Sequence, residues 1–305
     1  MMASEPSFSL RVDATNPGQF FACCGLLELA HRLWPGSEGW FEEKRFTIRA
    51  PERNKSASLD DLVDKLCKHR ISGLSDKERQ ERDELEAEKR RLKREKKELS
   101  KDKDERRKAL GTRAREGKVI LESPFSLVLN WWQTDDDVDS VKTWAGQQEI
   151  HKVTRAAQDQ IRDISDIFGL FDYACILRTP LEYQKNKLDS KKPVEPFYFD
   201  ARRFAHALDV GFSLDVQNVE TLAHPAVELL SLIGLQRFHP VAGSSKWRFR
   251  YCLWKQALSV YVAAAVVCDS VPAVDADVYE FRLLFRDDQK RYKAFSSATL
   301  IGDEL

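Results

Sequence analysis

Histidines, cysteines and carboxylates carry most catalytic and metal-binding chemistry, and this chain arranges them in no familiar catalytic pattern. The six histidines show no ligand spacing, and no phosphate-binding glycine loop, GxSxG elbow or HExxH motif is present. An acidic run at 135–139 (DDDVD) could attract a divalent cation, but an acidic loop before a helix is the simpler interpretation. The sequence therefore predicts no catalytic residue, no metal site and no cofactor.

Two adjacent cysteines, Cys23 and Cys24, raise the question of redox or metal chemistry, and their surroundings argue for packing instead. Asn16 is a favourable N-cap and Pro17 suits the first helical position, so a helix is predicted over 17–34. Apolar residues cover nearly its whole circumference, which is typical of a helix inside a core. Free cysteine is among the most buried residue types, and the six cysteines form no CxxC pair. We therefore expect buried, reduced thiols in a cytosolic protein.

Basic residues alternate with aromatic residues near the C-terminus, a pattern that suits binding. In KWRFRYCLWK (246–255) the two-residue period of a strand places Trp247, Phe249 and Tyr251 on one face, and EFRLLFR (280–286) repeats the pattern. If these strands are neighbours, their opposite face and the RYKAF segment carry seven cations that could follow a nucleic-acid backbone: Lys246, Arg248, Arg250, Arg282, Arg286, Arg291 and Lys293. The alternative is an ordinary solvated sheet face whose charges discourage aggregation.

The segment 75–118 differs in composition from the rest of the chain. It holds 18 basic and 13 acidic residues without proline or aromatic residues, and Leu85, Leu92 and Leu99 recur every seven residues. This pattern predicts a solvated helix, or a helical hairpin turning near Ser100–Asp104, that takes no part in the main core. Its most basic stretch offers further phosphate contacts at Arg90, Arg91, Lys93 and Arg94. The alternative is a solvated charged helix that binds no nucleic acid.

The elements that must position these residues indicate an α+β fold. The chain has 305 residues, 42% of them hydrophobic, and its 49 Lys and Arg balance its 49 Asp and Glu, so net charge by itself predicts no partner. We expect mostly antiparallel sheets packed on buried apolar helices, with a long charged helical insertion. Predicted helices lie at 17–34, 152–170 and 224–240, and predicted strands at 7–13, 44–50, 119–132, 197–200, 211–216, 246–255, 278–286 and 291–301, with 258–267 either a strand or a short helix. The predicted domains are 1–74 with 119–200, the insertion 75–118, and 201–305.

Three stretches carry a family resemblance: NPGQFFACCGLLELAHRLWPG (16–36), FYFDARRFAHALDVGFSLD (197–215) and PAVELLSLIGLQRFHP (225–240). They resemble the CRISPR-associated Csb-type proteins of type I-U (also called I-G) systems, which are subunits of the RNA-guided Cascade complex. The C-terminal strands fit more loosely, and 75–118 matches no part of that family. The shared stretches are structural in character and carry no catalytic signature.

The resemblance implies a cytoplasmic, prokaryotic role in antiviral defence as a small version of the large Cascade subunit. The implied partners are crRNA, target DNA, other Cas subunits and the Cas helicase-nuclease, with recognition of the protospacer-adjacent motif and no membrane contact. From the residues alone, two alternatives stay open. One is a crRNA-processing endoribonuclease that uses His206 or His239 beside Arg202, Arg203 or Arg237. The other is a scaffold that docks proteins through 75–118.

Overall fold

Two apolar helices in direct contact form the centre of the fold in this computed structural model, α1 (Pro17–Leu33) and α7 (Pro225–Gly234). The side-chain oxygen of Asn16 accepts hydrogen bonds from the N–H groups of Gly18 (3.0 Å) and Gln19 (3.4 Å), so the predicted N-cap of α1 is confirmed. Every α7 residue is buried, as is α1 up to Ala30. The helix predicted at 17–34 is confirmed to within one residue, whereas the one predicted at 224–240 begins at Pro225 and ends earlier, at Gly234.

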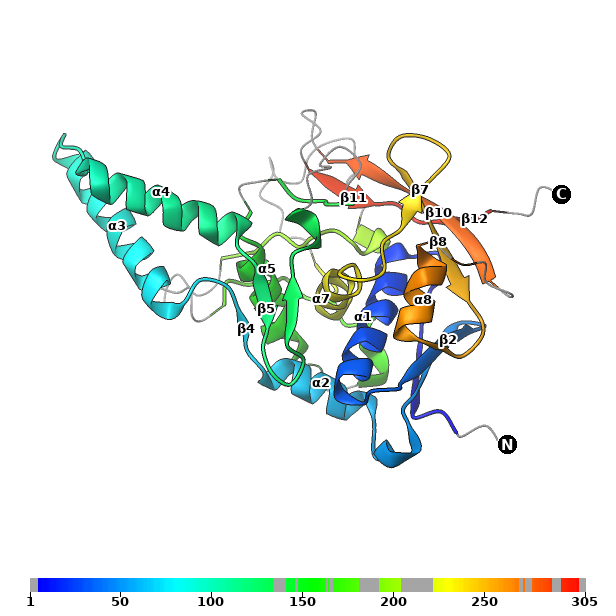
Figure 1. Cartoon of the computed structure of the whole chain (residues 1–305). Coiled ribbons are helices and arrows are strands. Elements are labelled where there is room, and N and C mark those ends of the chain that lie inside the picture. The colour runs from blue at the N-terminus through cyan, green and yellow to red at the C-terminus, as the bar shows by residue number, and fades with distance from the viewer. Residues whose placement is uncertain are drawn as a thin grey trace.

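The structure describes residues 5–133, 141–145, 148–162, 164, 167–180, 192–203, 222–268, 271, 276–286 and 292–301. Helices and antiparallel sheets place the chain in the α+β class, as predicted (Figure 1). Among the described residues, no helix is both long and apolar enough to cross a membrane. The other helices and helical turns are η1 (Glu52–Asn54), α2 (Leu59–Lys68), α3 (Asp76–Arg94), α4 (Lys101–Glu116), η2 (Trp131–Gln133), α5 (Ile150–Ile161), η3 (Ile167–Gly169), η6 (Ala201–Arg203) and α8 (Val260–Val267).

Three antiparallel sheets surround the central helices. In the first, the strand order is β1 (Phe8–Arg11), β3 (Arg45–Arg49), β2 (Glu38–Glu42) and β9 (Leu258–Ser259). In the second, it is β11 (Lys293–Phe295), β10 (Ala276–Phe285), β8 (Arg248–Trp254) and β7 (Val241–Ala242), with β12 (Thr299–Leu300) also paired to β10. The third joins β4 (Ile71–Ser72), β5 (Val119–Leu121) and β6 (Leu127–Leu129).

One hydrophobic cluster unites the first two sheets with α1 and α7. Its aromatic centre includes Phe20, which stacks on Tyr251 at 4.2 Å between ring centroids, and Phe281, which meets Phe295 at 4.9 Å. Because α1 and α7 belong to different predicted domains, buried residues of both predicted domains contribute to the same core.

The two adjacent cysteines are both fully buried in this core. Burial raises the pKa of the Cys23 thiol, and burial together with the neighbouring Cys23 raises that of Cys24. Both groups are therefore neutral thiols that pack as small hydrophobic side chains. The packing interpretation of the sequence is confirmed.

Some predicted elements were wrong. Residues 197–200 form no strand, because Tyr198 has a φ of 64° in the left-handed region, which interrupts extended backbone. The span 119–132 holds two short strands with a turn between them, and 152–170 holds α5 followed by a helical turn. Residues 258–267 form β9 and then α8, whereas the predicted strand at 211–216 lies outside the described residues.

Candidate nucleic-acid interface

The segment 75–118 folds into a hairpin of α3 and α4, which extends away from the sheets in Figure 1. Leu85 (9% exposed) and Leu110 (1%) are buried and lie outside the main core cluster, which agrees with the prediction that the Leu85, Leu92 and Leu99 stripe takes no part in that core. Because few apolar side chains are buried in the hairpin, ion pairs hold its two helices together along most of their length. Five of them connect the two helices: Arg113–Glu78 (2.6 Å), Arg106–Glu81 (2.8 Å), Arg107–Glu86 (2.7 Å), Lys103–Glu88 (2.7 Å) and Lys89–Asp104 (3.1 Å).

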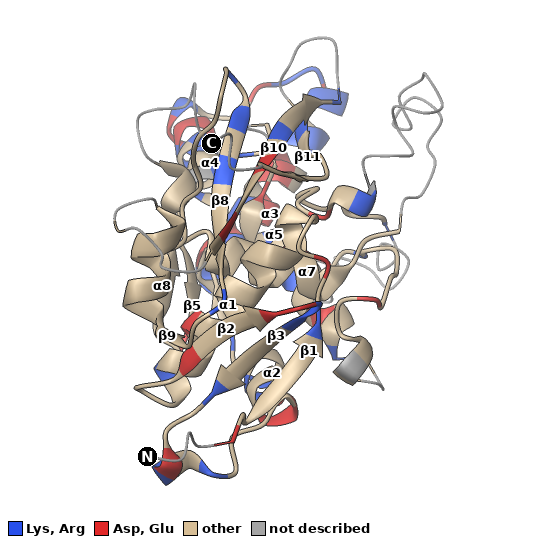
Figure 2. Cartoon of the chain, turned by 90° about the vertical axis from the view of Figure 1, so that its right-hand side faces the viewer, with Lys and Arg blue, Asp and Glu red and all other residues tan. Residues whose placement is uncertain are grey.

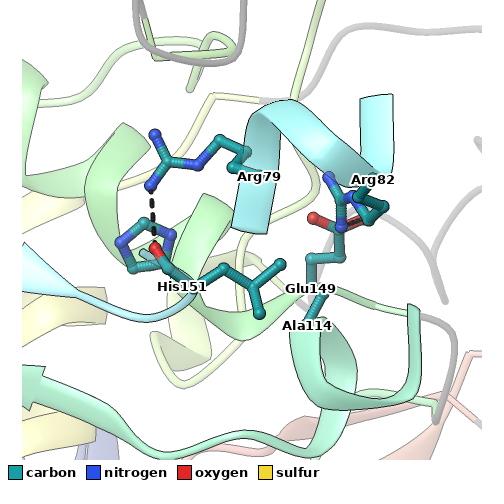
Figure 3. Close-up of a pocket in the computed structure, with 6 residues that line it drawn as sticks. Arg79, Arg82, Ala114, Glu149 and His151 are labelled. Atoms are coloured by element: carbon teal, nitrogen blue, oxygen red, sulfur yellow. Dashed lines mark hydrogen bonds and ion pairs between the residues drawn. The ribbon is translucent and has the colours of Figure 1, made fainter. Parts of the chain in front are cut away.

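The base of the hairpin is anchored to the body of the protein. Arg82 of α3 binds the carboxylate of Glu149, next to the start of α5, at 3.0 Å. Beside this pair, Arg79 is 7% exposed and donates a hydrogen bond to the carbonyl of Leu74 at 3.4 Å (Figure 3). His151 of α5 lines the same small pocket, and its Nε2 lies 2.9 Å from the carbonyl oxygen of Ile71. These contacts fix the direction in which the hairpin leaves the body.

Positive charge is concentrated at the far end of the hairpin. Residues 89–103, the hairpin tip, contain nine Lys and Arg and three Asp and Glu, whereas 75–88 and 104–118 together contain nine and ten. The tip therefore has a net charge of +6 and the stem a charge of −1, by subtraction of these counts. Within the part of the chain that the structure describes, five exposed tip cations form no ion pair: Arg90, Arg91, Lys93, Arg94 and Lys96.

The turn of the hairpin lies earlier than the sequence predicted. Helix α3 ends at Arg94, Lys96 has a φ of 57°, and α4 begins at Lys101. Asp102 and Asp104 then occupy the first turn of α4, where carboxylates interact favourably with the helix dipole. This preference favours helix rather than turn at 101–104, with Ser100 as the N-cap residue.

The alternating pattern of the C-terminal strands is confirmed on β8 and β10. Phe249, Tyr251 and Phe281 are buried, and Arg248, Arg250 and Arg282 lie on the other face. Arg248 stands directly opposite Arg282 across the two strands. Like charges in this position destabilise a strand pair unless an anion lies between them.

Glu280 supplies one such anion, and the sequence interpretation overlooked it although it precedes Arg282 by two residues. Its carboxylate, on a residue that is 8% exposed, accepts hydrogen bonds from Arg248 (2.6 Å) and from the backbone (2.8 Å) and hydroxyl (3.1 Å) of Ser244. Burial would raise the pKa of Glu280, but these hydrogen bonds outweigh it and lower the pKa. Arg282 and Lys246 stay exposed, so this face has a smaller cationic surplus than predicted.

Two other predicted cations of this sheet, Lys293 and Arg286, are engaged in contacts elsewhere. Lys293 pairs with Phe285 on the core-facing side, is 8% exposed and lies 4.4 Å from the ring centroid of Trp247, so its predicted placement was wrong. Arg286 lies over the ring of Tyr198 at 3.4 Å and binds Glu195 at 2.8 Å. Arg291 lies outside the described residues.

The exposed face of β8 and β10 that carries Lys246, Arg248, Arg250 and Arg282 is called here the cationic sheet face. The hairpin and the cationic sheet face lie at opposite ends of the molecule. In Figure 1 the hairpin extends to the left and β8 and β10 lie on the right; in Figure 2 the sheet is in front and α3 and α4 lie behind it. The predicted cations therefore form two separate surfaces, and the hairpin tip is the one with more unpaired charge.

The residues proposed for an endoribonuclease are not assembled into a site within the described chain. His239 is exposed, and His206 and the acidic run 135–139 lie outside the described residues. Arg202 binds the buried carboxylate of Asp200 at 2.7 Å, and Arg237 binds the buried Glu28 at 2.6 Å. The side chain of Arg203 is likewise not described. Among the described residues, no group of three or more His, Cys, Asp and Glu could hold a metal ion.

Comparisons of this chain with protein-family models, with curated proteins and with solved structures found no significant match. The two cationic surfaces and the fold therefore carry the evidence for function.

Proposed function

We propose that this chain binds nucleic acid without cleaving it, through phosphate contacts of the hairpin tip. The observation that carries the proposal is the segregation of charge: the tip holds +6 at the end of a projecting, anchored hairpin whose stem is nearly neutral. Exposed arginines and lysines without intramolecular partners contribute most to the free energy of binding phosphates, because each such contact releases a condensed counterion from the nucleic acid.

The chemistry of the tip favours recognition of the backbone over recognition of bases. The whole segment 75–118 lacks aromatic residues, so it has no ring on which a base could stack. Phosphate contacts position a protein on nucleic acid and carry no sequence information. We expect the tip to bind RNA or DNA of many sequences.

The resemblance to Csb-type proteins extends this proposal to a biological setting. In that setting the chain is a non-catalytic subunit of a type I CRISPR interference complex in the prokaryotic cytoplasm. It assembles with crRNA and other Cas subunits, contacts target DNA, contributes to recognition of the protospacer-adjacent motif, and works with the helicase-nuclease. The cationic sheet face is a second, weaker surface for the same complex.

Binding of fluorescently labelled RNA and duplex DNA to the full chain tests the proposal. A tip variant carries glutamine at Arg90, Arg91, Lys93, Arg94 and Lys96. A matched control loses the same charge from exposed positions on the body, with glutamine at Arg11, Lys44, Arg53, Lys55 and Lys68. At 0.1 M salt the tip variant should bind about tenfold more weakly or worse, and the control should stay within about twofold.

Equal losses in both variants would show that only total charge matters and would reject the tip as the binding surface. Incubation of repeat RNA with the wild-type chain, with divalent metal or with EDTA, separates binding from cleavage: specific cleavage would favour the endoribonuclease. Expression of the tagged chain with its genomic neighbours tests the larger setting, since a stoichiometric RNA–protein complex should then purify with it.

A further inference from the structure

An exposed tyrosine stands on a helix that is otherwise part of the core. Tyr261 of α8 is 58% exposed, the highest value among the large hydrophobic side chains in the described ranges, and its neighbour Val262 is 46% exposed. The following residues of α8 are largely buried against the central cluster. An aromatic ring on so rigid a support has little conformational entropy to lose when it binds a flat partner.

A guanidinium group lies over this ring. Arg237, which follows α7, has its Cζ 4.9 Å from the ring centroid of Tyr261. The position of Arg237 is fixed by Glu28 of α1, a residue that is 1% exposed and accepts from Nε (2.6 Å) and Nη2 (3.3 Å) of this arginine. The pair thus combines the exposed ring of Tyr261 with the guanidinium of Arg237, whose position is fixed by its hydrogen bonds to Glu28.

A second arginine is bound to the same carboxylate. Arg32 donates through Nε to Glu28 at 2.7 Å and through Nη1 to the carbonyl oxygens of Phe125 (2.7 Å) and Ser126 (3.1 Å). Nη1 of Arg237 and Nη2 of Arg32 have no partner among the described residues. Both side chains are partly exposed, so fixed N–H donors of two arginines can reach a ligand.

The cluster carries surplus positive charge. Burial would raise the pKa of Glu28, but hydrogen bonds from Arg237 and Arg32 outweigh it and lower the pKa, so one carboxylate faces two guanidinium groups. His31 stands edge-on to Tyr261 with ring centroids 5.1 Å apart, and its buried Nδ1 has no hydrogen-bond partner among the residues that the structure describes. The single carboxylate of Glu28 cannot neutralise both arginines. Their partly exposed guanidinium groups are therefore suited to binding an anionic ligand.

We propose that Tyr261, Arg237 and Arg32 form a binding site for one nucleotide of a single-stranded nucleic acid, with its base on the Tyr261 ring and its phosphate on the two arginines. This inference rests on the proposed function, which makes nucleic acid the ligand of the chain. A nucleotide matches both halves of the site, because it joins a flat aromatic group to an anion at short range. A base in a duplex is covered by its neighbours, so the site selects single strands.

The site complements the hairpin tip. Helix α8 follows β8 in the chain and lies at the end of the molecule away from the hairpin (Figure 1). The tip contacts phosphates of any nucleic acid, whereas the Tyr261 site requires an accessible base.

Substitution of Tyr261 in the full chain tests the site. The probes are a single-stranded RNA that contains 2-aminopurine, whose fluorescence falls when it stacks on a ring, and the matching duplex. A stacked base contributes ~1–3 kcal/mol, so Tyr261→Leu should weaken single-strand binding about five- to 150-fold. Tyr261→Phe keeps the ring and should retain both affinity and quenching. Duplex affinity should be the same for all three proteins.

The outcomes separate this inference from the proposed function. If the wild type binds single strands but Tyr261→Leu leaves affinity and quenching unchanged, the nucleotide site is rejected while the tip proposal stands; a patch that holds a protein partner would give this result. If the wild type binds neither probe, both proposals fail. If Tyr261→Leu weakens single-strand and duplex binding equally, the site does not discriminate strands and the inference is also overturned.

Discussion

The backbones of α1 and α7 approach each other closely in the core, and Gly25→Ala perturbs this contact directly. A Cβ atom at Gly25 would lie 2.1 Å from the carbonyl oxygen of Leu230 and 3.2 Å from the backbone nitrogen of Gly234. On the other helix, a Cβ at Gly234 would lie 2.1 Å from the carbonyl oxygen of Phe21. The two glycines therefore set the distance between the helices.

The loss of stability in Gly25→Ala can be estimated from the movement of α1 and α7 that the new Cβ atom requires. The obstructing atoms belong to the backbone of a buried helix, so relief requires the helices to separate by about 1 Å, with loss of contacts along both. Overpacking of this kind costs up to about 3 kcal/mol, and the better helix propensity of alanine returns about 1 kcal/mol. We expect Gly25→Ala to lower the free energy of unfolding by about 2 kcal/mol.

Urea unfolding followed by tryptophan fluorescence measures this change. Gly111→Ala in α4 is the matched control, because it makes the same substitution within a helix. A Cβ atom at Gly111 would have as its nearest heavy atom Nη1 of Arg115, at 3.5 Å, an ordinary contact distance. The control should keep or raise stability by up to about 1 kcal/mol. A Gly25→Ala protein as stable as the control would refute the close contact between α1 and α7.

Two further predictions concern buried groups. The pKa of Asp200 is lowered because hydrogen bonds and charge from Arg202, His224 and Asn16 outweigh its burial, and that of Glu28 is lowered by its two arginines. A carboxyl group whose pKa is lower in the folded than in the unfolded protein stabilises the fold above its unfolded pKa of about 4, and this stabilisation is lost as the pH falls through the folded pKa. The melting temperature should therefore drop below about pH 4. The drop should be less steep in Asp200→Asn, which lacks one of the two carboxyl groups. Replacement of Cys23 and Cys24 together by serine should lower stability by about 1–3 kcal/mol in thermal melts and leave RNA binding unchanged; loss of a bound metal would contradict the packing role.

The sequence predicted what depends on local pattern. The buried helix at 17–34 follows from an apolar circumference between a cap and a proline, and the alternation on β8 follows from the strand period. Lys293 shows the limit of this reasoning, because its face depends on pairing with Phe285, which only the register reveals. Tyr198 shows another limit, since its left-handed backbone (φ 64°) is uncommon for a residue other than glycine and no local pattern in the sequence signals it.

The candidate sites were partly predictable for the same reason. The cations of the hairpin tip stand together in the sequence, but the ion pairs that neutralise the stem join residues 15 to 35 positions apart. The Tyr261 cluster joins α1, the segment that follows α7, and α8, and the sequence shows only an apolar run at 258–268 there. Contacts between distant segments decide which charges stay free, and local pattern does not contain them.

The salt dependence of binding tests the central claim most directly. Equilibrium constants for a duplex DNA are measured between about 50 and 200 mM salt with the wild type, the tip variant and the matched control. Each neutralised phosphate contributes nearly one unit to the slope of log K against log salt, and about two to four tip cations can contact phosphates at once. The slope should therefore flatten by about two to four units in the tip variant and by less than one in the control. An unchanged slope in the tip variant would show that the hairpin is a solvated or protein-docking element and would contradict the account.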